Sequence, residues 1–181
     1  MDAIGSPVPD RRAAWSQSLE IPPILRRLRI DFRASHRQPS AVRLVFATVV
    51  SLAGSLLADA LLVVIGTSIF PAIKHYVHFQ FHDYARLTII GVLFACIAWP
   101  IVTRISSAPR WLFLRLAILV TLVLFAPDLW ILKQGQRPQA VAILMCMHIA
   151  IALVTYNALV RISAIQPLAA AHAPSARENV S

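Results

Sequence analysis

Three ionisable side chains, Asp59, Asp128 and His148, stand inside long apolar stretches of the sequence. A charged group costs about 2.5–3.5 kcal/mol at the centre of a membrane helix, so each of them needs a structural or functional reason. A histidine beside a carboxylate has its charged form favoured and can carry a proton near neutral pH. We therefore interpret His148 as the centre of a candidate ligand or proton site, with Asp59 as its expected partner.

A structural role is the alternative for all three residues. Asp59 and His148 could form an interhelical hydrogen bond that fixes the register of a helical bundle. Asp128 directly follows Pro127 near the end of its apolar stretch, so its carboxylate could simply reach the lipid headgroups. Depth along the helices, at 1.5 Å per residue, places all three groups in the outer half of the bilayer.

A second set of candidate ligands lies between the first two apolar stretches. On a helix, His75, His78 and His82 would share one face, with Asp83 beside them. Three imidazoles on one face could bind Zn²⁺ or Cu²⁺. The alternative is an interfacial loop, because the segment also holds aromatic residues typical of headgroup depth: Tyr76, Phe79, Phe81 and Tyr84.

Four apolar stretches must position these side chains, and each is long enough to cross a bilayer, since about 20 residues suffice. They cover approximately residues 42–69, 87–105, 111–132 and 138–162. The short links Ser106–Arg110 and Lys133–Arg137 force the helices that they join to run antiparallel. The sequence therefore predicts an all-α, integral membrane, antiparallel four-helix bundle over residues 42–162.

Composition and charge agree with a membrane protein. Hydrophobic residues make up 58% of the 181 residues and charged residues 14%, against roughly 45–50% and about 25% in soluble domains. The net charge of +9 does not indicate a nucleic-acid partner, because the basic residues flank the apolar stretches.

The distribution of basic residues predicts the orientation. Ten lie on the side of the N-terminus: Arg26, Arg27, Arg29, Arg33, Arg37, Arg43, Arg104, Arg110, Arg115 and Arg161. Four lie on the opposite side: Lys74, Arg86, Lys133 and Arg137. Because cytoplasmic loops carry the excess of Lys and Arg, both ends of the chain are expected in the cytoplasm, at the cell membrane.

Polar segments flank the bundle on both sides. Residues 1–40 are predicted to be a disordered basic tail, and residues 163–181 a second disordered tail. Within the first, residues 24–33 place Leu25, Leu28 and Phe32 on one helical stripe. The arginines Arg26, Arg27, Arg29 and Arg33 could hold such a helix on an anionic membrane surface, or the segment could be a solvated basic linker.

Motifs for catalysis or cofactor binding are not visible. The chain has five glycines and no phosphate-cradling glycine loop, no zinc-protease histidine pair and no Ser-His-Asp arrangement. Cys96 and Cys146 lie in apolar stretches, where we interpret both as small buried thiols. We therefore expect no enzymatic activity and no cofactor.

Short motifs resemble one known family. They are Ala58-Asp59-Ala60-Leu61 through Gly66, Phe125-Ala126-Pro127, and Leu144-Met145-Cys146-Met147-His148. In these and in its four spans the chain resembles a family of small bacterial membrane proteins catalogued as domain of unknown function 6069. The resemblance covers about residues 42–162, implies a four-span fold and singles out His148. Asn is usual in that family where Asp59 stands, and the family has no established activity.

Three functional hypotheses follow. The first is a non-enzymatic accessory or binding subunit that holds a partner protein, a lipid or a small ligand through its bundle. The second is a small oligomeric transporter or proton-coupled permeation protein that uses Asp59 and His148, since four helices leave little room for a path in a monomer. The third is a metal- or redox-binding membrane protein that uses the loop histidines.

Overall fold

A computed structural model describes residues 30, 36–74 and 76–167 of the chain. The described part contains four long helices: α3 (Ala41–Ile69), α4 (Phe81–Ile105), α5 (Pro109–Lys133) and α6 (Pro138–Ile162). All four are long and apolar enough to cross a membrane. The predicted all-α class with four membrane-length helices is confirmed.

Local sequence signals account for the helix ends. Ser40 precedes α3, and its hydroxyl oxygen accepts a hydrogen bond from the backbone N–H of Arg43 at 3.4 Å. Helices α5 and α6 each begin with a proline, which suits the first helical turn because no N–H is needed there. Gly135, with φ of 89°, makes the turn between these two helices.

The second helix begins earlier than predicted. Helix α4 begins at Phe81 instead of near Leu87, so residues expected in the outer loop form its first turns. Asp83 in the first turn favours this start, because a carboxylate is stabilised at the positive end of the helix dipole. The signal was hidden by the aromatic and histidine residues, which also suit an interfacial loop.

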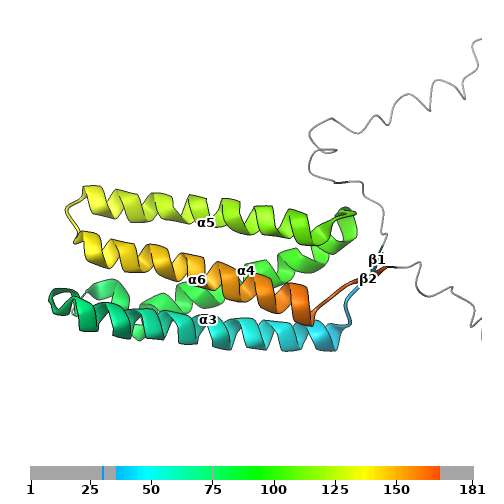
Figure 1. Ribbon diagram of the computed structural model, residues 1–181, viewed down its shortest axis with the longest axis horizontal. Helices are drawn as coiled ribbons and strands as arrows, with labels where there is room; N and C mark the ends of the chain where they lie inside the picture. Colours follow the sequence, from blue (N-terminus) through cyan, green and yellow to red (C-terminus); the bar gives the residue numbers. More distant parts are fainter. Residues whose placement is uncertain (1–29, 31–35, 75, 168–181) are drawn as a thin grey trace, which may run out of the picture.

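Helix α6 lies at the centre of the arrangement, with α5 on one side and α3 on the other (Figure 1). Two glycines let α3 approach it closely. A Cβ on Gly54 would lie 2.9 Å from Cγ1 of Val154, and a Cβ on Gly66 would clash with the side chain of Ile143. Small residues at helix interfaces allow this kind of close packing in membranes.

Helix α4 passes behind α6 and packs mainly on α3 (Figure 1). It meets α5 at the short link between them and diverges from α5 toward the other end (Figure 1). The large apolar side chains on the outer faces stay exposed, as in Val42, Leu87 and Phe94 at 79%, 71% and 69%. Such surfaces fit a lipid environment and not water.

Two packed clusters hold the ends of the bundle. At one end Trp99 packs against Phe113 and donates a hydrogen bond from Nε1 to the carbonyl of Ser163 at 3.2 Å. At the other, the short 3-10 helices η1 (Pro71–Ile73) and η2 (Val77–Phe79) cover the helix ends. Their buried residues Ile73 and Phe79 belong to a cluster with Ala140 and Met147 of α6.

The segments before α3 and after α6 meet at one end of the molecule. Strand β1 (His36–Arg37) pairs antiparallel with strand β2 (Gln166–Pro167), beside the start of α3 and the end of α6 (Figure 1). The candidate membrane-surface arginines Arg26, Arg27, Arg29 and Arg33 lie outside the described residues, as does most of the predicted helix over 24–33.

Candidate functional site

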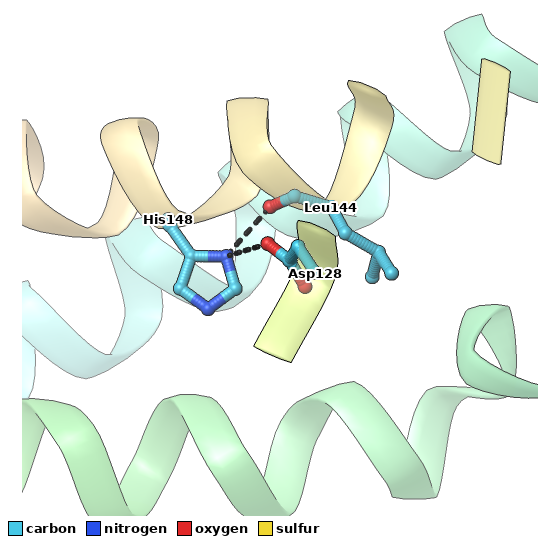
Figure 2. Close-up of polar contacts among 3 residues, drawn as sticks. All are labelled: Asp128, Leu144 and His148. Atoms are coloured by element: carbon cyan, nitrogen blue, oxygen red, sulfur yellow. Dashed lines mark hydrogen bonds and ion pairs between the residues drawn. The ribbon is translucent and has the colours of Figure 1, made fainter. Parts of the chain in front are cut away.

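His148 projects from α6 toward α5 and α4. Its Nδ1 lies 2.8 Å from the carbonyl oxygen of Leu144 and 3.5 Å from Oδ2 of Asp128 (Figure 2). A carbonyl can only accept, so Nδ1 is the donor in this hydrogen bond. The other ring nitrogen, Nε2, points away from both partners, toward α4 (Figure 2).

Asp128 is the carboxylate closest to His148, and its side chain is buried in the bundle. Burial disfavours the alternative interpretation, in which its carboxylate reaches outward to the lipid headgroups. Its side chain is only 8% exposed and turns inward from α5 to the imidazole. Apart from Nδ1 of His148 at 3.5 Å, Oδ2 of Asp128 has no polar partner among the described residues. The inward side of α5 at this position faces α6, which explains the burial.

Asp59 has a different partner from the expected one. Its side chain is fully buried, and Oδ2 accepts a hydrogen bond of 2.6 Å from the hydroxyl of Thr88 in α4. Oδ1 has no hydrogen-bond partner in the described part of the chain. Asp59 therefore joins α3 to α4, while His148 joins α6 to α5.

Ser51 and Ser55, which are not among the predicted site residues, extend this polar interior. Ser51 and Ser55 precede Asp59 at four-residue intervals, and all three are fully buried on one stripe of α3. The hydroxyls of Ser55 and Thr155 lie 3.5 Å apart, between α3 and α6. The four-residue spacing, which repeats a helical face, was the signal that could have identified this stripe.

A groove of about 820 Å³ runs between α4 and α5, with α6 as its floor. Its walls are mostly apolar and include the exposed side chains of Leu87, Phe94 and Val120, so it opens along the sides of the helices. Most of its polar lining residues gather toward one end: His78, Asp83, Tyr84, Thr88, Asp128 and His148. Thr121, Thr155 and Tyr156 lie further along the groove. At the other end lie the stacked rings of Phe113 and Tyr156.

The two loop histidines that the structure describes, His78 and His82, do not share one helix. His78 belongs to η2 and His82 to α4, with Gln80 in extended conformation between them, while His75 lies outside the described residues. Nε2 of His82 pairs with Oδ1 of Asp83 at 3.2 Å. Within the described ranges, no group of three or more His, Cys, Asp or Glu side chains is placed to hold a metal ion.

The two cysteines differ in environment. Cys96 is buried in the core beside Trp99, as predicted, but Cys146 is exposed on the outer face of α6. The prediction of two buried thiols is wrong for Cys146, because in a spanning helix an apolar neighbourhood in sequence also marks a lipid-facing position.

Fold and site together define a class: an all-helical protein with four membrane-length helices and a side-open groove that is polar at one end. Comparison with protein-family models, curated proteins and solved structures gives no match for the chain. The resemblance to the family of domain of unknown function 6069 therefore stays a prediction.

Proposed function

We propose that the chain is a non-enzymatic integral membrane protein that binds an amphipathic molecule from the bilayer in the groove between α4 and α5. The observation that carries this proposal is the groove of about 820 Å³, apolar along its length and polar at one end. Concave, largely apolar sites with a few convergent polar groups are the usual form of ligand sites. Such a protein would serve as an accessory or binding subunit in the membrane.

The open side of the groove supports a ligand that arrives through the bilayer. In a bilayer, hydrocarbon chains would lie beside the exposed Leu87 and Phe94, so one of them could enter without crossing water. The polar end, where His148 and Asp128 meet, would receive the head of the same molecule. A ligand with an apolar chain and a polar head therefore matches the apolar length and the polar end of the groove.

The proposal includes an antiparallel bundle in the cell membrane with both ends in the cytoplasm. The pairing of β1 with β2 supports a common side for the two ends of the helical region. Arg104 and Arg110 flank the link between α4 and α5, and Arg43 and Arg161 lie in the first turn of α3 and the last turn of α6. An excess of arginine at one membrane face marks the cytoplasmic side.

The proposal is tested by purification in mild detergent, followed by mass spectrometry of the copurified lipids and proteins. Gly91 lines the groove, and a Cβ at this position would meet no atom within 4 Å, so we use Gly91→Leu to place a large side chain in the groove. Ala53→Leu adds the same side chain to the exposed face of α3 and is the matched control. We expect an amphipathic molecule to copurify with the wild type and Ala53→Leu and to be lost from Gly91→Leu. Equal retention in all three would contradict the proposal.

The buried polar stripe of α3 favours a second candidate, a proton-coupled transporter that acts as a homo-oligomer. Ser51, Ser55 and Asp59 form a polar series through the interior, and Oγ of Ser51 and Oδ1 of Asp59 have no described hydrogen-bond partner. Carboxylates and hydroxyls in such series relay protons in pumps and transporters. In liposomes with a pH-sensitive dye, this candidate requires a proton flux that Asp59→Asn abolishes and Ser68→Ala, at an exposed position of α3, does not.

A further inference from the structure

The geometry points to a ligand class: a long-chain neutral lipid whose head donates hydrogen bonds, such as an alcohol or a hydroquinone, and carries no phosphate. This inference rests on the proposed function, since it takes the groove between α4 and α5 as a binding site. The observations that support it are the polar atoms at the polar end of that groove.

The unfilled positions at the polar end are hydrogen-bond acceptors. Nδ1 of His148 donates to the carbonyl of Leu144, so in the neutral ring Nε2 carries a lone pair. No described residue hydrogen-bonds to Nε2, which points toward α4 across the groove (Figure 2). Oδ2 of Asp128 also has no hydrogen-bond donor among the described residues, but the atom is fully buried, so Nε2 is the acceptor that a ligand in the groove would meet.

The chemistry of these atoms selects the head of the ligand. A hydroxyl can donate to Nε2 of His148, whereas an ether or a quinone carbonyl can only accept. Buried acceptors left without a donor lose their interaction with water and gain nothing in return. A head that supplies an O–H is therefore favoured over one of equal size that does not.

Charge at the same end disfavours a phosphate head. No Lys or Arg lines the groove in the described part of the chain, while the carboxyl groups of Asp83 and Asp128 do. Proteins bind phosphate groups largely through arginine and lysine, and neither lines the groove in the described part of the chain. Either carboxyl group, when ionised, would also repel a phosphate.

The length of the groove indicates a long chain. Its lining residues on α5 extend from Phe113 to Ile131, about 27 Å at 1.5 Å per residue. The hydrocarbon core of a bilayer is about 30 Å thick. The tail of the ligand would lie along Phe94, Val120 and Ala117, from the polar end toward the stacked rings of Phe113 and Tyr156.

A competition experiment with matched probes tests the inference. The full-length protein in phosphatidylcholine nanodiscs is photolabelled with hexadecanol that carries a diazirine in its chain. The competitors are hexadecan-1-ol, its methyl ether and hexadecyl phosphate, which share one chain and differ in the head. We expect the alcohol to compete at a concentration about tenfold lower than either of the others, the usual effect of one unmatched buried hydrogen bond.

Variants assign the preference to the polar end. His148→Ala should bring the alcohol and the ether to within about twofold of each other, whereas His82→Ala, at an exposed histidine outside the groove, should keep the preference. Asp128→Asn is the second variant, for the case that His148→Ala does not fold. It keeps the size of the side chain but replaces an acceptor with a donor beside Nδ1 of His148, so it should also weaken the preference for the alcohol. Persistence of the full preference in both folded variants would overturn the inference.

The outcomes separate this inference from the function on which it rests. If Gly91→Leu abolishes photolabelling but the three competitors act equally, the groove binds lipid and the head class is wrong. Stronger competition by the phosphate would overturn the head class in the same way. If Gly91→Leu leaves labelling unchanged, the groove is not the site, and the proposed function fails as well.

Discussion

Asp59 shows how a single residue holds two helices together in the interior of this bundle. Its fully buried carboxylate accepts one hydrogen bond, from Thr88, and no described group satisfies its other oxygen. A buried acceptor of this kind depends strongly on the one donor that it has. The energetic role of Asp59 is therefore best tested through Thr88.

We predict that Thr88→Val destabilises the protein by about 1–3 kcal/mol, because it leaves the buried carboxyl of Asp59 with no described hydrogen bond. Thr67→Val is the matched control, since the hydroxyl of Thr67 bonds only within its own helix, to carbonyls of Val63 and Val64. Reversible unfolding in mixed detergent micelles measures both. Equal stability of the two variants would show that the bond between α3 and α4 adds nothing.

For Asp59→Asn we predict the opposite result, namely no large loss of stability. The amide oxygen of Asn can still accept from Thr88, and the change removes a potential charge from the bundle. We expect the unfolding free energy to stay within about 1 kcal/mol of wild type or to rise, as measured by the same unfolding experiment. A loss as large as that of Thr88→Val would mean that Asp59 is needed as a carboxylate.

Tyr76, outside the spanning helices, provides a pH-dependent prediction. Burial, and next the charge of Asp128, raise the pKa of the Tyr76 hydroxyl. The stabilisation from keeping this group neutral is complete below the ordinary tyrosine pKa of about 10 and is lost as pH rises through the higher folded value. Thermal unfolding between pH 8 and about 11 should show a smaller alkaline loss of stability in Tyr76→Phe than in wild type. At neutral pH the two should be equally stable, because the buried hydroxyl has no described hydrogen-bond partner.

At the scale of elements, the sequence predicted the existence and the length of the helices better than it predicted which helix faces are in contact. Apolar runs bounded by Ser40, Pro109 and Pro138 identify α3, α5 and α6 almost to the residue. They do not say which faces meet, because a spanning helix is apolar toward lipid and toward its neighbours alike. For that reason the pairing of His148 with Asp128, the stripe from Ser51 to Asp59 and the exposure of Cys146 emerge only from the structure.

The contact between α3 and α6 depends on the absence of a side chain at Gly66. We predict that Gly66→Ala destabilises the protein by about 1–3 kcal/mol, because its Cβ would clash with Ile143. Ile143→Val removes the Cδ1 atom that lies nearest, so the double variant should recover part of the loss. Gly91→Ala, with open space around it, should be neutral or stabilising by up to about 1 kcal/mol. Unfolding in mixed micelles provides the comparison, and equal effects at Gly66 and Gly91 would contradict close packing.

At the scale of the whole molecule, the divergence of α4 from α5 creates the groove on which the proposed binding function depends. Three helices pack in sequence, α5 on α6 and α6 on α3, while α4 leans on α3 (Figure 1). No side chain of the described residues fills the gap that remains between α4 and α5, and this gap is the groove. The sequence could not predict it, since the short link between the two helices fixes their proximity at one end only.

The orientation of this molecule decides which membrane face the polar end of the groove meets. The arginines near the ends of the helices predict that the link between α4 and α5 is cytoplasmic and the link between α5 and α6 is external. Ser107 and Gln136 lie exposed in these two links and can each be replaced by cysteine in a Cys96→Ala, Cys146→Ala background. In intact cells a membrane-impermeant maleimide should label Gln136→Cys and not Ser107→Cys, and permeabilisation should expose both. The reverse labelling pattern would mean that the molecule has the opposite orientation in the membrane. His148 and Asp128 would then lie in the cytoplasmic half of the bilayer, and the neutral lipid would bind with its head at the inner leaflet.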